Sequence, residues 1–295
     1  MIWLGERRGH LVDWLTQRWV QVTGDRLAED QAPWLWGPVG STSGIGPAFF
    51  EELAAARGLV VLPPAPDAGL LPGLGALVGP RFRPGDVAPA IASFYAHTAG
   101  FDLQIRSRWS GPFRAMGWMI ARIFSRRLAQ LNMPLSDREL QGGVHSRIVR
   151  VADPASGALM HTAWVRTAKE TRRPVFVGQY GIAEIPGHEG PCVKVVFPLP
   201  NGNAMIFLRP RVDEDGGFSL VSDGRRFGDT GFYFTVVAGP HERWVRYVRT
   251  MKESLSLRAE GKDDVAAVHR FRVFGLPFLE LQYAIARKSI AAARP

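Results

Sequence analysis

The chain has 295 residues, of which 46% are apolar and 21% charged, so it can bury a globular core and is not compositionally disordered. Its 36 lysines and arginines outnumber its 27 aspartates and glutamates, which gives a net charge of +9 and favours anionic partners. The excess charge is spread along the chain without a recognisable nucleic-acid-binding motif, and a single cysteine, Cys192, excludes an internal disulfide. These properties argue against a nucleic-acid-binding protein and against a disulfide-stabilised secreted domain.

The first residues predict a helix and no secretion signal. Leu11, Leu15 and Trp19 recur at helical spacing within residues 1–22, while Glu6 and Arg7 interrupt any early apolar run. The most apolar long stretch, residues 58–80, contains several prolines that would break a spanning helix. Together with the single cysteine, which suggests a reducing compartment, these features predict a cytoplasmic protein without a transmembrane helix.

The segments that follow predict mostly short elements. A helix is expected over residues 47–57, with Pro47 in its first turn and Gly58 as its stop. The Pro- and Gly-rich stretch that continues to residue 89 is apolar enough to pack against the rest of the molecule. Residues 87–99 predict another helix and residues 101–109 a first strand. We therefore treat residues 1–90 as a helical and Pro/Gly-rich N-terminal segment that packs on a main domain of residues 91–295.

Residues 113–131 have the strongest helical pattern in the chain. Met116, Ile120 and Ile123 belong to an apolar face, and Arg122 and Arg126 lie on or beside the polar face. An apolar stripe of this kind usually faces a core, so the helix is expected to cover or plug the neighbouring domain. The alternative is a cationic amphipathic helix in peripheral contact with an anionic membrane surface.

From residue 144 onward, short apolar stretches alternate with turn residues, which is the pattern of an all-β domain. Asn201-Gly202, between the strands predicted at 192–199 and 204–208, is a strong hairpin signal. Strands predicted at 254–258 and 265–274 alternate apolar and polar residues. No helical crossover intervenes, so the fold class is α+β and mainly β: an antiparallel calycin-like (lipocalin-like) barrel of about nine or ten strands preceded by helices.

Sequence motifs predict no cofactor and no metal. Residues 40–46 resemble a dinucleotide-binding glycine turn, but no buried strand precedes them, no acidic residue follows, and no tyrosine has a lysine four residues later. The seven histidines lack metal-binding spacing, and no Gly-x-Ser-x-Gly nucleophile elbow occurs.

Several short blocks resemble an uncharacterised bacterial family, domain of unknown function 4166, over residues 94–285. The blocks are Phe94-Tyr95, Asp102-Leu103, Trp109-Ser110-Gly111-Pro112-Phe113, Trp164-Val165-Arg166-Thr167, Arg225-Arg226-Phe227 and Phe274-Gly275-Leu276-Pro277-Phe278. The resemblance implies that these blocks belong to one domain, and it brings no reaction, cofactor or catalytic residue with it.

The aromatic content, with 17 Phe, 9 Trp and 5 Tyr, and the absence of catalytic motifs favour a barrel that binds an apolar or amphiphilic small molecule, such as a lipid or a polyketide-like compound. The alternative is a cyclase or isomerase of the same architecture that holds a flexible apolar substrate in a reactive conformation. The segment from Arg225 to Phe234 fits either a ligand-binding barrel mouth or a braced turn into a core strand. The residues predicted to bind ligand are Trp164, Tyr180, Lys194, Phe232, Phe234 and His269. The residues predicted to assist catalysis are His161, Arg166 and Glu184.

Overall fold

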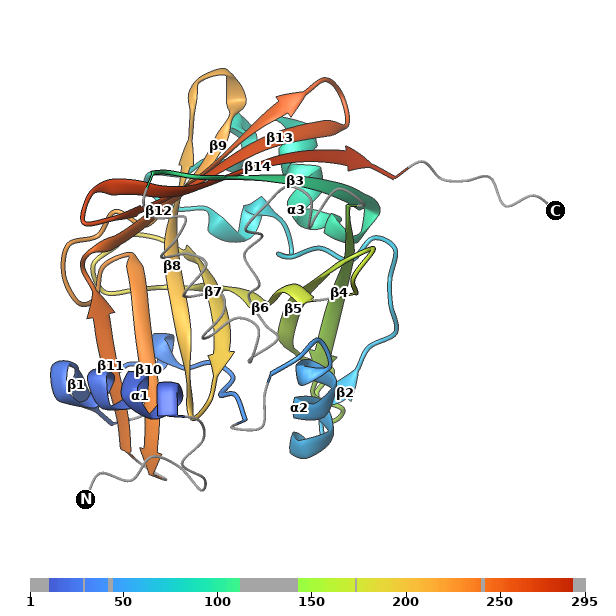
Figure 1. Ribbon diagram of the computed structural model, residues 1–295. Helices are drawn as coiled ribbons and strands as arrows, with labels where there is room; N and C mark the ends of the chain where they lie inside the picture. Colours follow the sequence, from blue (N-terminus) through green and yellow to red (C-terminus); the bar gives the residue numbers. More distant parts are fainter. Residues whose placement is uncertain are drawn as a thin grey trace.

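The computed structural model describes residues 11–28, 30–41, 45–111, 143–172, 174–239 and 242–288, and it is mainly β (Figure 1). The predicted helix at residues 113–131, and with it the predicted membrane contact, lies outside the described residues. Three α-helices precede most of the strands: α1 (Leu11–Thr23), α2 (Phe49–Arg57) and α3 (Pro89–Ala96). Gly58 ends α2 in the left-handed conformation, with φ 65°, as predicted for the stop of that helix.

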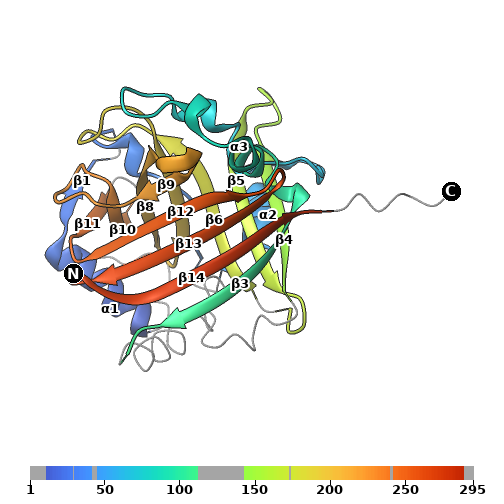
Figure 2. The ribbon, with the colours of Figure 1, turned by 90° about the horizontal axis from the view of Figure 1, so that it is seen from above.

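Ten antiparallel strands close into a barrel, which confirms the predicted fold class (Figures 1 and 2). Around the ring these strands are β3 (Phe101–Trp109), β4 (Val144–Ala152), β5 (Leu159–Ala168), β6 (Pro174–Ala183), β7 (Cys192–Leu199), β8 (Gly202–Val212), β9 (Phe218–Val221), β12 (Met251–Glu260), β13 (Asp264–Val273) and β14 (Leu276–Arg287). β14 pairs with β3, and the pair Leu103–Val144 joins β3 to β4, so the ring is complete.

Side chains alternate between the inside and the outside of this ring. In β3, Phe101, Leu103 and Ile105 are buried, while Asp102 and Gln104 between them are exposed. Successive strand residues point to opposite faces of a sheet, so alternating polarity places one row of apolar side chains inside the barrel. The same rule decides which polar residues of the other strands can reach the interior.

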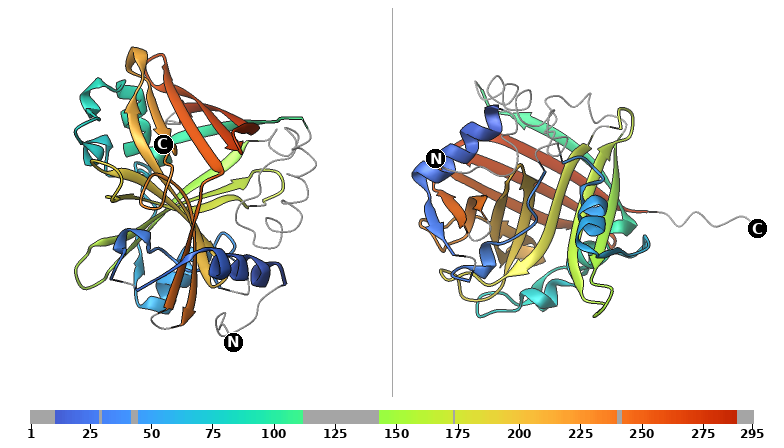
Figure 3. Two further views of the ribbon diagram at one scale, coloured as in Figure 1. Left: turned by 90° about the vertical axis from the view of Figure 1, so that its left-hand side faces the viewer. Right: turned by 90° about the horizontal axis from the view of Figure 1, so that it is seen from below.

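Strand β8 belongs to the barrel and also carries an extension of the same sheet. Its first half pairs with β10 (Gly231–Gly239), and its second half pairs with β9. β10 continues to β11 (Glu242–Val248) and then to β1 (Asp25–Leu27), and helix α1 packs on this extension (Figure 3). The two-residue strand β2 (Val60–Val61) pairs with the last two residues of β4, Val151 and Ala152.

Helix α3 and the segment before it pack against one end of the barrel. Leu70, Leu74 and Phe82 are buried in the same apolar core as the barrel strands. Phe94 of α3 lies 5.5 Å from the ring of Phe101 and 6.2 Å from that of Trp164. Aromatic side chains from both parts therefore form one continuous core at this end.

Helix α1 has an unusual distribution of polarity. It exposes Leu11 (66%) and Leu15 (53%) and buries Gln17 (3%). Gln17 donates a hydrogen bond from Nε2 to the carbonyl oxygen of Pro200 at 3.0 Å, so a polar contact fixes this face to the loop between β7 and β8. The apolar residues that predict the helix, Leu11, Leu15 and Trp19, are therefore largely exposed.

Candidate functional site

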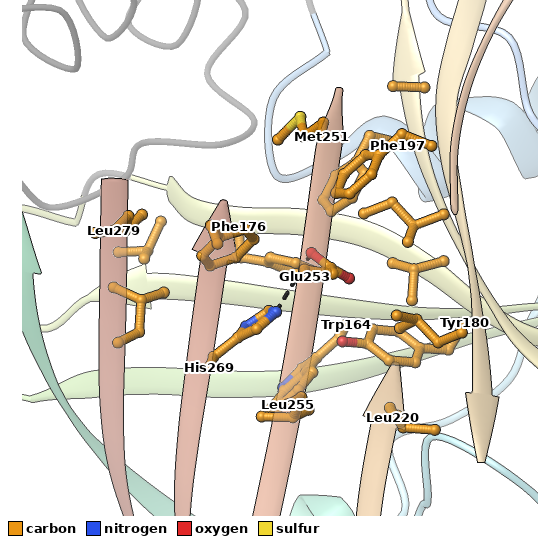
Figure 4. Close-up of a pocket in the computed structure, with 18 of the residues that line it drawn as sticks. Trp164, Phe176, Tyr180, Phe197, Leu220, Met251, Glu253, Leu255, His269 and Leu279 are labelled. Atoms are coloured by element: carbon orange, nitrogen blue, oxygen red, sulfur yellow. Dashed lines mark ion pairs between the residues drawn. The ribbon is translucent and has the colours of Figure 1, made fainter. Parts of the chain in front are cut away.

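The barrel contains a cavity of about 770 Å³, a size typical of sites for small organic ligands. Its lining comes from nine of the ten ring strands and from α3, and it extends past β10 to α1. Most lining side chains are aliphatic or aromatic, and Figure 4 shows part of this lining. A cavity with this lining favours the burial of an apolar ligand.

One wall of the cavity is aromatic. Trp164 of β5 lies 6.0 Å from Phe176 and 5.7 Å from Tyr180, both on β6, measured between ring centroids. Phe176 in turn lies 5.2 Å from Phe197 on β7. The indole Nε1 of Trp164 donates a hydrogen bond to the hydroxyl of Ser146 at 2.7 Å, which satisfies the ring's polar atom and fixes its orientation.

Arg166 carries its positive charge into this aromatic wall. The residue is only 6% exposed, and its guanidinium carbon lies 4.3 Å from the centre of the Trp164 ring and 4.1 Å from that of Phe176. It also forms a side-chain hydrogen bond with Tyr283 of β14. The two aromatic faces attract the cation and hold its plane between them.

Glu253 and His269 form a second polar group in the cavity. Glu253 Oε2 of β12 lies 3.3 Å from His269 Nε2 of β13, and Figure 4 shows the two side chains directed toward each other. The contact is at ion-pair distance but lacks the geometry of a hydrogen bond. The carboxylate side chain is 3% exposed and the imidazole 18%, so the pair is largely removed from solvent.

Two phenols complete the polar cluster. Burial raises the pKa of Tyr180, and the charge of Arg166 opposes that rise. Burial likewise raises the pKa of Tyr283, again against Arg166. Both hydroxyl groups are therefore protonated at neutral pH and are available as hydrogen-bond donors or acceptors. The cluster of Arg166, Tyr180, Glu253, His269 and Tyr283 can thus bind a polar group or exchange a proton inside an otherwise apolar space.

Six of the nine residues predicted from sequence to act in the site line the cavity. They are Trp164, Arg166, Tyr180, Phe232, Phe234 and His269. The segment from Arg225 to Phe234 combines features of both of its predicted roles. Asp229 accepts backbone hydrogen bonds from Arg225 and Arg226 and so braces a turn, whereas Phe232 and Phe234 reach the cavity.

Three predicted residues lie elsewhere. His161 is on the outer side of β5, where its Nδ1 lies 2.9 Å from Gln179 Oε1 and its ring 6.3 Å from that of Phe50, and burial lowers its pKa. Glu184 is exposed just beyond the end of β6. Lys194 donates hydrogen bonds to the carbonyl oxygens of Trp34 and Trp36 on the outside of β7, where burial lowers its pKa to about 8. Catalytic roles for His161 and Glu184 and a ligand-binding role for Lys194 remain predictions.

Strand alternation explains much of this division. His161 is three residues before Trp164 on one strand, so the two side chains point to opposite faces. Sequence reasoning missed Glu253, because the strand predicted here began at Ser254. Glu253 is two residues before Leu255 and four before Leu257, and this shared parity is the signal that places a carboxylate on the inner face.

The chain is 28% identical over 221 residues to the "Uncharacterized membrane protein YndJ" of Bacillus subtilis (strain 168). The alignment covers 74% of this chain and 38% of that protein, so the chain spans well under half the length of its relative. No family model matches the sequence. No solved structure matches it either. The resemblance to domain of unknown function 4166 therefore stays a prediction.

This comparison corrects the predicted location. The relative is named as a membrane protein, so the prediction of a cytoplasmic protein is wrong. In the described ranges, no helix combines the length and the apolar character that a bilayer span needs.

Proposed function

We propose that the protein binds an apolar or amphiphilic small molecule inside its β-barrel. The observation that carries this proposal is the cavity of about 770 Å³, with its aromatic wall at Trp164, Phe176 and Tyr180 and its aliphatic remainder. A bound apolar molecule would leave water for this lining and gain roughly 25 cal/mol per Å² of apolar surface that it buries.

Filling the cavity tests the proposal, and two adjacent alanines of β13 provide a matched pair. Ala267 lines the cavity and is 3% exposed, whereas Ala266 lies on the opposite face of the same strand. Ala267→Trp places an indole in the ligand's space, while Ala266→Trp adds the same indole outside the barrel.

The measurement is native mass spectrometry of gently purified full-length protein, followed by organic extraction and by binding of the neutral dye Nile red. We expect the unmodified chain and Ala266→Trp to carry an apolar molecule or to bind the dye, and Ala267→Trp to lose at least about tenfold in affinity. Circular dichroism establishes that Ala267→Trp is folded. Equal binding by the two alanine variants, or no binding by the unmodified chain, contradicts the proposal.

A second candidate function is that of a cyclase or isomerase of the same architecture, favoured by the Glu253–His269 pair. A carboxylate and an imidazole 3.3 Å apart, both lining a largely apolar cavity, could act as an acid–base pair on a substrate held in a reactive conformation. Both groups line the cavity, so they are better placed for this role than His161 or Glu184.

The two functions differ in what happens to an extracted or supplied ligand. If the protein is an enzyme, Glu253→Gln should abolish conversion of the ligand recovered from the cavity while keeping its binding within about threefold. Arg258→Met, on the same strand but exposed, provides the control. A ligand that is bound and released unchanged by the unmodified chain excludes this second function for that ligand.

A further inference from the structure

Arg166 is a buried cation whose charge is balanced by no carboxylate of its own. Among the described residues no acidic side chain lies within ion-pair distance of its guanidinium, and its Nε has no hydrogen-bond partner. A buried charge that lacks a paired ion is costly, and proteins usually compensate it with a counter-ion or with a full set of hydrogen bonds. The aromatic faces of Trp164 and Phe176 and the hydroxyl of Tyr283 supply only part of that compensation.

The acidic groups that line the cavity do not form an ion pair with Arg166. In the described part of the lining the acidic residues are Asp13, on α1, and Glu253. Glu253 lies 3.3 Å from His269 and acts on the same two phenols, Tyr180 and Tyr283, as Arg166 does, but from beyond ion-pair distance of the guanidinium. Arg166 therefore brings to the cavity lining a positive charge that has no acidic side chain at ion-pair distance among the described residues, in a wall that is otherwise aromatic or aliphatic.

The hydroxyl of Tyr283 adds a second donor beside the guanidinium. Because burial raises its pKa, the phenol keeps its proton at neutral pH, and a phenol that accepts a hydrogen bond from Arg166 can still donate its own. A planar guanidinium next to a phenolic O–H matches the oxygens of a carboxylate or a phosphate, which form short, charge-assisted hydrogen bonds with arginine.

We propose that the cavity takes amphiphiles with an anionic head group, a carboxylate or a phosphate monoester, which binds Arg166 and Tyr283 while the apolar tail fills the rest of the barrel. This inference rests on the proposed function, since it assumes that the cavity holds an apolar molecule. It adds the ligand's class and its orientation. The tail lies along the aliphatic side chains that line the cavity away from Arg166.

Three probes with the same twelve-carbon tail test the inference: dodecanoate, dodecyl phosphate and dodecan-1-ol. Each is titrated against delipidated full-length protein loaded with Nile red, and displacement of the dye reports binding. We expect one or both anions to displace the dye at about tenfold to a hundredfold lower concentration than the alcohol, as a charge-assisted hydrogen bond predicts. Which anion binds more tightly distinguishes a carboxylate ligand from a phosphate ligand.

Three variants assign the preference to its residues. Arg166→Met keeps an apolar side chain of similar length and should abolish the preference for the anion while leaving the affinity for dodecan-1-ol within about twofold. Tyr283→Phe should weaken anion binding about threefold to tenfold through loss of one hydrogen bond. Arg258→Met removes an exposed arginine of β12 and controls for the change in net charge. If Arg166→Met does not fold, Tyr283→Phe decides the assignment.

The outcomes separate this inference from the function on which it rests. If the three probes displace the dye equally, or if Arg166→Met retains the preference for the anions, the inference is overturned while binding of an apolar ligand stands. If neither the dye nor any probe binds the unmodified chain, both proposals fall together.

Discussion

Glu253 and His269 face each other between neighbouring strands inside the barrel, with Oε2 and Nε2 3.3 Å apart and the carboxylate side chain only 3% exposed. Removing one member of a buried pair leaves the other without its partner, and such losses are large. We expect His269→Leu to lower the free energy of unfolding by about 3 kcal/mol, measured by urea denaturation at neutral pH.

The double variant Glu253→Leu/His269→Leu tests the cause of that loss. Because it removes both polar groups and supplies apolar side chains of suitable size, it should be more stable than His269→Leu alone. A double variant that is no more stable than the single one would show that His269 stabilises the barrel through packing, for example against Phe271, whose ring lies 4.1 Å away.

The close approach of β8 and β10 leads to a second prediction. A Cβ atom at Gly202 would lie 1.9 Å from the carbonyl oxygen of Thr235, whereas a Cβ atom at Gly181 on β6 would meet nothing within 4 Å. Gly202→Ala should therefore destabilise the fold by about 1–3 kcal/mol or more, because the backbone of Gly202 or of Thr235 must move to make room for the methyl group. Gly181→Ala should be neutral or stabilising by about 0.4–1 kcal/mol, because it restricts the unfolded chain.

Thermal unfolding followed by circular dichroism compares the two glycine variants. Gly181→Ala serves as the matched control for a change of glycine to alanine within a barrel strand. Equal melting temperatures for Gly202→Ala and the unmodified chain would contradict the close packing of β10 on β8 at this point.

The sequence predicts the barrel well because its strands alternate in polarity with the period of the sheet. The strands predicted at 101–109 and 192–199 have the bounds seen in the structure, and Asn201-Gly202 marks the hairpin between β7 and β8. Local polarity and turn chemistry are sufficient for such elements, because they are read over a few neighbouring residues.

Features that depend on distant neighbours were not predictable in this way. β8 divides its pairing between β9 and β10, and nothing in its own residues indicates where the partner changes. The polar cluster joins Arg166, Glu253 and Tyr283 from three strands, whose proximity follows from closure of the ring. The predicted strand began at Ser254, three residues after the true start of β12 at Met251, and so left Glu253 out of the candidate site.

The buried amine of Lys194 should make the free energy of unfolding depend on pH. Its pKa is lowered from 10.5 to about 8 by burial beneath Trp34 and Trp36. Between these two values the unfolded chain binds a proton that the folded chain has lost, so the free energy of unfolding rises with pH across this window. The rise should be about 2–3 kcal/mol, and the contribution should be flat below pH 8.

Lys194→Met isolates this contribution, because the buried tyrosines titrate equally in both proteins and cancel in the difference. Urea denaturation from pH 7 to pH 10 should show the unmodified chain gaining stability relative to Lys194→Met. The variant itself should be less stable at pH 10 by about 1–3 kcal/mol, since two carbonyl oxygens lose their donor. A difference between the two proteins that does not change with pH would contradict the lowered pKa.

We expect the thiol of Cys192, on β7, to react only after the protein unfolds. The residue is 0% exposed, and burial raises its pKa from 9.0 to about 12. The thiolate is the reactive form, and a pKa raised by about three units lowers the thiolate population at pH 8 by about a thousandfold. Burial of the sulfur slows the reaction further, because it excludes the reagent. Labelling with iodoacetamide at pH 8 should therefore be slower in the native protein than in urea by at least that factor.

Lys262→Cys in a Cys192→Ala background, with its thiol in the exposed β12–β13 turn, should react at once and controls for the reagent. Rapid native labelling of Cys192 would mean that β7 separates from its neighbours faster than a stable barrel allows.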